Sequence, residues 1–223
     1  TNQQTWTSTE LSVFDFLMTG SIGDIDIASG LQFRDESFDV ARGASSIAQF
    51  DAAGNITQPA DLLFLGGGLE STASRNATAL FIEGSMNPSD RLEVKGALRY
   101  EDLESDSSVD PKIAFRYQAS DELALRASFS TSFREASLAQ LTSTNISLQG
   151  IQDYNADGSA KGGTAFIRIA QANNPNLAPE ESENMNIGAM WNPTDKLSMK
   201  LDYWAIDYTN VITIESAQGK VAA

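Results

Sequence analysis

The sequence of 223 residues contains neither cysteine nor histidine. Without cysteine, a disulfide scaffold and thiolate metal sites are excluded. Without histidine, the commonest general base and transition-metal ligand are missing. Carboxylates, lysines and tyrosines could still act in catalysis, but none has the pattern of a nucleophile beside its base. The sequence therefore predicts that this chain is not an enzyme.

Basic residues are also scarce, since 15 Lys and Arg stand against 30 Asp and Glu, for a formal net charge of -15. Phosphate binding needs a basic patch, so nucleic acid is not an expected partner. No apolar run reaches the length of a transmembrane helix. The first residues, TNQQTWTSTE, lack the regions of a signal peptide. The chain is long enough for one all-β domain or for part of something larger.

Apolar and polar residues alternate with period two through most of the sequence, which is the pattern of half-exposed β-strands. Only EASLAQL at 135–141 is a candidate for a short helix. The alternation predicts eight strands, at roughly 5–17, 22–36, 72–86, 91–103, 110–118, 122–133, 182–191 and 196–209.

The expected connections differ in length. A five-residue turn recurs at 87–91, 118–122 and 192–196, twice with Asn-Pro at its start and always with Asp at its fourth position, and such residues favour tight turns. Strands one to eight are therefore expected to form four hairpins. Between the hairpins the links are of roughly 35, 8 and 48 residues. Short turns at one end and long loops at the other are typical of an outer-membrane barrel, whereas a sandwich usually has modest loops at both ends.

The two faces of the predicted strands favour the same class. One face carries charges that suit a water-filled or protein-filled lumen, namely Lys95, Arg99, Arg116, Arg126, Lys200 and Asp202. On the other face, Tyr117 and Trp191 occupy the last apolar position before a turn, where an interfacial aromatic girdle belongs. Pattern alone leaves two alternatives open, a small self-closed eight-stranded barrel with a structural or adhesive role and a soluble β-sandwich binding module.

Several motifs resemble the barrel of TonB-dependent outer-membrane receptors. The stretches 110–141 and 173–212 carry most of this resemblance, and 28–39 resembles an earlier barrel strand. The family commonly has a Ser-Phe-Arg-Ala-Pro strand end, which reads Ser132-Phe133-Arg134-Glu135-Ala136 here, with the last step altered. It also has an Asn-Pro-Asn-Leu-x-Pro-Glu loop, which matches Asn174 to Glu180.

The resemblance implies an all-β fold, an antiparallel transmembrane segment of about eight strands belonging to a 22-stranded barrel. Residues 1–223 would then be a partial barrel domain without its plug. The implied location is the outer membrane of a Gram-negative bacterium. The implied function is energy-coupled uptake of a scarce ligand, such as a ferric siderophore or another nutrient. The implied partners are outer-membrane lipid and lipopolysaccharide, the TonB complex acting through a plug, and the small-molecule ligand.

On this reading, loops 37–71 and 134–181 contribute to the outer mouth. Phe50, Tyr154 and Phe166 could contact ligand there or pack loop against loop, and Arg116 and Arg126 could contact plug, ligand or lumen water. No substrate residue is assigned.

One further motif, DYNADG at 153–158, matches the opening of a calcium loop. Asp153, Asn155 and Asp157 stand at alternate positions, but Thr164 occupies the twelfth position, where a bidentate glutamate is expected. Asp-Gly and Asn also make ordinary turns. Calcium is therefore a possible ligand of this loop, and no other cofactor is expected.

Overall fold

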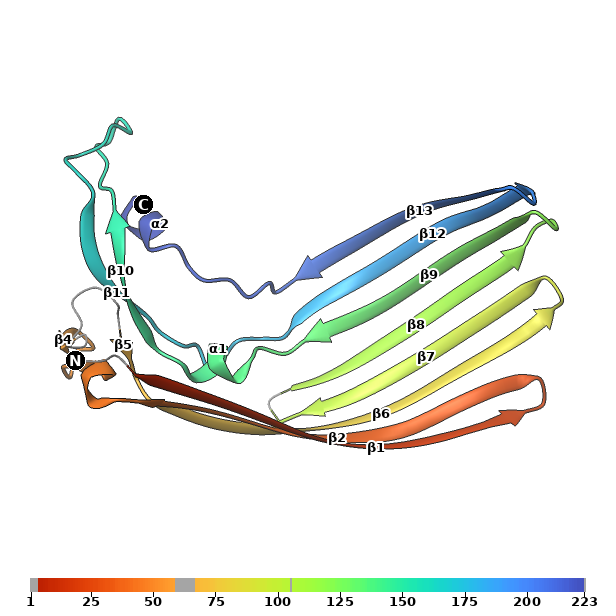
Figure 1. Ribbon diagram of the computed structural model, residues 1–223, viewed down its shortest axis with the longest axis horizontal. Coiled ribbons are helices and arrows are strands. Elements are labelled where there is room, and N and C mark those ends of the chain that lie inside the picture. The colour runs from red at the N-terminus through yellow and green to blue at the C-terminus, as the bar shows by residue number, and fades with distance from the viewer. Residues whose placement is uncertain (1–3, 59–66, 105, 223) are drawn as a thin grey trace.

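The computed structural model describes residues 4–58, 67–104 and 106–222. Its main feature is one curved antiparallel sheet with the strand order β1-β2-β6-β7-β8-β9-β12-β13 (Figure 1). The strands are β1 (Thr5–Ile22), β2 (Ile25–Arg42), β6 (Ser71–Ser89), β7 (Leu92–Leu103), β8 (Asp106–Gln118), β9 (Leu123–Arg134), β12 (Glu180–Thr194) and β13 (Leu197–Thr209). These are the eight predicted strands, several of them longer than expected.

The hairpin turns are shorter than the five residues predicted. β1 and β2 pair through Ile22 and Ile25, so their turn is only Gly23-Asp24, with Gly23 at a φ of 60° that favours glycine. In β6–β7 and β12–β13 the Asn-Pro residues of the motif lie in a register shift inside the strand, before a two-residue turn. Because proline has no N–H to donate, a bulge accommodates it.

The link expected after Leu103 is also wrong in length. Leu103 pairs directly with Asp106, so β8 begins there and the eight-residue loop is absent. The first residues of β8 were not predicted as strand, because the polar stretch before Lys112 lacks alternating apolar residues. On the side away from the short turns, β7 and β8 therefore end earlier than the longer strands β1, β2 and β6.

Strand register confirms the predicted faces, because neighbouring rows of side chains point to opposite sides of a sheet. One row contains Leu31, Leu80, Tyr100 and Val109, and the next contains Gln32, Ala79, Glu101 and Ser108. The large apolar side chains of the first face are exposed, as shown by Leu201 at 75%, Leu80 at 54% and Trp191 at 47%. In these strands every Lys and Arg, including the predicted set, falls on the opposite face.

The sheet is open in the part of the chain that the structure describes. β1 and β13 stand at its two ends and do not pair with each other. A self-closed eight-stranded barrel requires that pairing, and a sandwich requires a second sheet over the apolar face, which is instead exposed. Both alternatives are therefore contradicted, and the arrangement is that of a wall section from a larger barrel.

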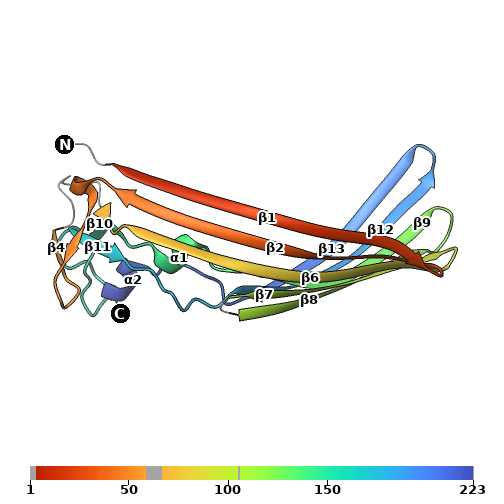
Figure 2. The ribbon, with the colours of Figure 1, turned by 90° about the horizontal axis from the view of Figure 1, so that it is seen from below.

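Small elements gather at the end of the sheet opposite the short turns and form what we call the cap (Figure 2). They include a three-stranded sheet of order β11-β10-β5, formed by β5 (Gly67–Gly68), β10 (Asn145–Ile151) and β11 (Ala165–Gln171). The remaining elements are η1 (Ala44–Ser46), β3 (Gln49–Phe50), β4 (Ile56–Gln58) and α2 (Ala217–Ala222). None of these elements was predicted, because segments of two to seven residues give little periodic signal. Within the described ranges, no helix is long and apolar enough to span a membrane.

Candidate functional site

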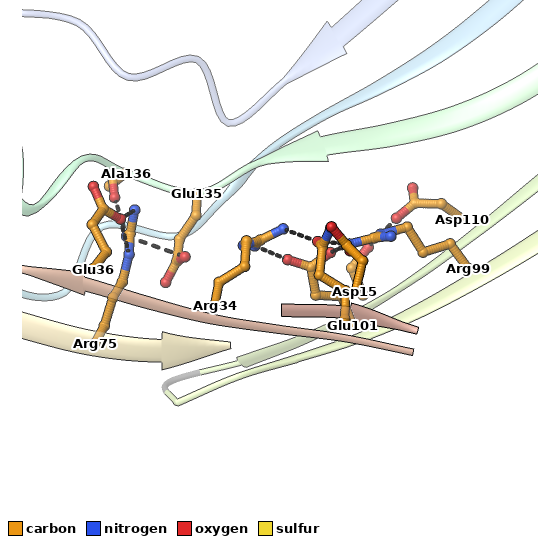
Figure 3. Close-up of polar contacts among 11 residues, drawn as sticks. Asp15, Arg34, Glu36, Arg75, Arg99, Glu101, Asp110, Glu135 and Ala136 are labelled. Carbon is orange, nitrogen blue, oxygen red and sulfur yellow. Dashed lines mark hydrogen bonds and ion pairs between the residues drawn. The ribbon is translucent and has the colours of Figure 1, made fainter. Parts of the chain in front are cut away.

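The concave face of the sheet carries a charged network around Glu101, drawn in Figure 3. Glu101 lies on β7 with a side chain only 3% exposed, and it forms ion pairs with Arg34 of β2 and with Arg99. The Arg99 pair measures 2.7 Å from Nη2 to Oε2. Gln32 Oε1 accepts hydrogen bonds from both guanidinium groups, at 3.1 and 2.9 Å, and Gln32 Nε2 donates to Asp15 at 2.7 Å. Two arginines therefore share one buried carboxylate, and Asp15 adds a second acid at the edge of the network through Gln32.

A second cluster surrounds Arg75 on β6. Its guanidinium pairs with Glu36 of β2 at 2.7 Å and with Glu135, just beyond β9, at 3.1 Å. Burial raises the pKa of the Glu135 carboxyl, although Arg75 acts in the opposite direction. This cluster joins strands at the two sides of the short β7–β8 hairpin.

A cavity of about 720 Å³ lies between the two clusters. Its charged lining comes from four strands, β2, β6, β7 and β8, and from the residue after β9, and includes Arg34, Arg75, Arg99, Glu101, Lys112 and Glu135. Groups of both signs alternate along this wall, so the cavity suits a polar solute or a polar protein surface. The alternation predicted that charges would line this face, but their partners lie on strands far apart in sequence and could not be paired beforehand.

The two arginines singled out from the sequence lie nearer the short turns. Arg126 of β9 pairs with Asp202 of β13 at 2.5 Å. Arg116 Nη2 donates to Gln118 Oε1 at 3.0 Å. Both side chains face the lumen as predicted, and their contact with ligand or plug stays a prediction.

The three aromatic residues proposed for the mouth all lie in the cap. Phe50 is half-buried in β3, whereas Tyr154 is 44% and Phe166 71% exposed. Phe166 lies beside Gly150 of the neighbouring strand, where an added Cβ would be 3.4 Å from its ring. Ligand contact by these residues stays a prediction.

The possible calcium loop is a tight turn held by its own groups. Asp157 Oδ1 accepts hydrogen bonds from the amide and hydroxyl of Ser159, at 2.9 and 2.6 Å, and the hydroxyl bond is the main reason why the pKa of the Asp157 carboxyl is lowered. Asp153 pairs with Lys161 at 3.2 Å, and Asn155 donates to Ser159. Among the described residues, no three carboxylates converge on a metal position. Calcium binding at this loop stays a prediction.

The two motifs that carry the family resemblance contact each other in the fold. Arg134 of the Ser-Phe-Arg motif pairs with Glu180, which ends the Asn-Pro-Asn motif, at 2.5 Å. Glu180 Oε1 also accepts a hydrogen bond from the amide of Ile212 at 2.8 Å. These motif residues therefore join β9, β12 and the segment after β13.

These features define the class of protein as an outer-membrane β-barrel, of which this chain forms part of the wall. More particularly, the chain belongs to the TonB-dependent receptor-like β-barrel family, whose family model matches residues 1–222. The resemblance seen in the sequence is thereby confirmed. Members of this family are transporters rather than enzymes.

Solved structures with the same fold are receptors and transporters. A mutant of the ferric enterobactin receptor PfeA from Pseudomonas aeruginosa, in complex with enterobactin, is 17% identical with a TM-score of 0.63, over 92% of this chain and 27% of that one. The siderophore receptor PirA from Acinetobacter baumannii is 16% identical with a TM-score of 0.64, over 92% and 27%. The copper transporter OprC is 13% identical with a TM-score of 0.59, over 90% and 30%.

The chain thus spans between a quarter and a third of the length of these structures. No curated protein matches the sequence.

Proposed function

We propose that this chain is part of the wall of an outer-membrane receptor that takes up a scarce ligand with energy from the TonB complex. The family membership over residues 1–222 is the observation that carries this proposal. The ligand class that we favour is a metal chelate of the siderophore type, because similar structures include receptors for ferric enterobactin and other siderophores. Coupling to TonB would pass through a plug domain.

The physical features of the sheet agree with this role. An exposed apolar face suits hydrocarbon, and a charged concave face suits a lumen that holds water, ligand or plug. We propose outer-membrane lipid as the partner of the apolar face. We propose lipopolysaccharide as the partner of the same face closer to the cap, where the strands carry carboxylates such as Asp35, Asp102 and Glu183.

Uptake of radioactive ferric enterobactin by cells tests the proposal. The complete receptor would be expressed in a Gram-negative host that lacks its own receptors for this chelate, with and without a functional TonB protein. We expect accumulation only when both receptor and TonB are present. Other ferric siderophores and copper would be tested in parallel, because the copper transporter OprC has a similar fold. Absence of TonB-dependent accumulation for every compound would contradict uptake of metals and their chelates.

A further inference from the structure

The loop between β9 and β12 does not project freely from the sheet. Its first part, residues 135–142, which we call the clasp, leaves β9 and reaches β2 and β6 past the ends of β7 and β8 that lie away from the short turns (Figure 1). The clasp contains α1 (Leu138–Thr142), which coincides in part with the predicted helix at 135–141. The early end of the β7–β8 hairpin, at Leu103 and Asp106, leaves the space for this crossing.

Arg75 joins the clasp to the sheet through one guanidinium group (Figure 3). On one side, Nε and Nη2 donate to Glu36 Oε2 at 2.8 and 2.7 Å. On the other side, Nη1 donates to the carbonyl oxygen of Ala136 at 2.6 Å and pairs with Glu135 Oε2 at 3.1 Å. The side chain is only 16% exposed. A planar fork can serve all these acceptors at once, whereas a lysine ammonium is a single point charge.

Apolar packing secures the clasp beside this polar contact. Leu138 is 4% exposed and forms a buried cluster with Phe38 and Val40 of β2. The short helix is held by a capping box, in which Ser137 and Gln140 satisfy each other's backbone amides. The clasp is therefore ordered by local bonds as well as by its contacts with the sheet.

The clasp holds the returning end of its own loop, and the residues just after it hold the neighbouring loop. Asn173 donates to the carbonyl oxygen of Leu141 at 2.7 Å. Just past the clasp, the Leu69 amide of the β2–β6 loop donates to the carbonyl oxygen of Thr144 at 3.1 Å. Arg42 Nη2 donates to Asn145 at 2.8 Å. The two loops that border the mouth are thus connected into one unit.

We propose that Arg75 is a positioning residue that fixes the β9–β12 loop across the outer mouth before any ligand arrives. Its significance for uptake rests on the proposed function, but the loop position does not. A mouth arranged in advance spares the ligand the entropy cost of ordering the loop, and so favours binding.

Pulsed electron paramagnetic resonance on the complete receptor, without ligand, tests this proposal. Spin labels at Gln149 of β10 and Asn76 of β6 report the distance between loop and wall. We expect a narrow distribution for the otherwise unchanged receptor and one at least twice as wide for both Arg75→Ala and Arg75→Lys. Arg126→Ala, which removes an arginine paired elsewhere on the same face, is the matched control and keeps the narrow distribution. An unchanged width in Arg75→Ala would overturn the proposal.

A second variant covers the case in which Arg75→Ala does not fold, which a heated and unheated gel comparison reveals. Arg75→Lys keeps a positive charge in the cluster but loses the planar fork that reaches Glu36 and Ala136 together. We expect the same broadening, and an unchanged width in this variant would also overturn the proposal.

Binding of ferric enterobactin then separates this proposal from the proposed function. We expect Arg75→Ala to bind this probe about tenfold more weakly. Equal affinity together with a broadened loop would overturn the role of Arg75 in binding. No binding by the unchanged receptor would instead contradict enterobactin as ligand and leave the loop measurement as a separate result.

Discussion

Arg126 on β9 and Asp202 on β13 form an ion pair across the strand that separates them. The guanidinium and carboxylate meet at 2.5 Å above Gly188 of β12, which stands between them in the register. A Cβ on Gly188 would lie 2.2 Å from Asp202 Oδ1 and 2.8 Å from Arg126 Nε. A side chain at this position would therefore force both charged ends to move out of their present geometry.

We expect Gly188→Ala to separate this pair at a small cost in stability. Both side chains are partly exposed, at 44% and 32%, so the interaction is worth less than about 1 kcal/mol. A double-mutant cycle with Arg126→Ala and Asp202→Ala, measured by urea unfolding from lipid vesicles, should give a coupling energy only when Gly188 is present. An undiminished coupling in the alanine background would contradict this geometry.

Glu101 should matter more for stability than the exposed acids of the lumen. Glu101→Gln leaves Arg34 and Arg99 facing each other without a shared carboxylate. Breaking a buried pair costs about 3–5 kcal/mol, and we expect roughly 2–3 kcal/mol because both guanidiniums are about one-third exposed. The same urea measurement should show less than about 1 kcal/mol for the control Glu93→Gln, whose partner Lys95 is 59% exposed. Equal losses in the two variants would show that the network around Glu101 contributes no special stability.

Lowering the pH should stabilise the contact of the clasp with the sheet, because it protonates the Glu135 carboxyl. Burial raises the pKa of this carboxyl, opposed by Arg75 and Arg34 and assisted by Glu36 and Glu101. A carboxyl with a raised folded-state pKa contributes stability that is present below its unfolded pKa and is lost as pH rises through the folded value. The spin-label distribution should therefore narrow between pH 7 and pH 5 in the unchanged receptor relative to Glu135→Gln. Identical pH responses in the two proteins would rule out this role of Glu135.

Alternation was sufficient to predict the strands and the faces of the wall, because one face meets an apolar and the other a polar environment. It placed Leu201 outward and Lys200 inward, as the register confirms. It could not give the turn lengths, because the register shift before Ser89 absorbs Asn-Pro within a strand. It also missed β5 and the start of β8, where polar or glycine residues carry no periodic signal.

For the candidate site, the sequence predicted the kind of residues on the face but not their contacts. The sequence indicated a charged lumen face, but not that Arg34 and Glu101, which are 67 positions apart, would meet. That contact depends on the strand order, in which β6 lies between β2 and β7. It also depends on Ala79 of β6, which pairs with Glu101 and whose small side chain leaves room for the contact across β6. The role of Arg75 depends on the path of the loop after β9, which the alternation of residues within strands does not determine.

Cysteine labelling along β13 in intact outer membranes tests the central claim most directly, namely that this sheet crosses the membrane with its apolar face in lipid. Residues 1–223 contain no cysteine, so cysteines introduced singly at 200–205 into a receptor otherwise free of cysteine report one position each. A water-soluble maleimide should label positions 200, 202 and 204, which face the lumen, and should spare 201, 203 and 205 until detergent is added. Equal labelling of both sets without detergent, or labelling of the opposite set, would contradict a barrel wall in the outer membrane.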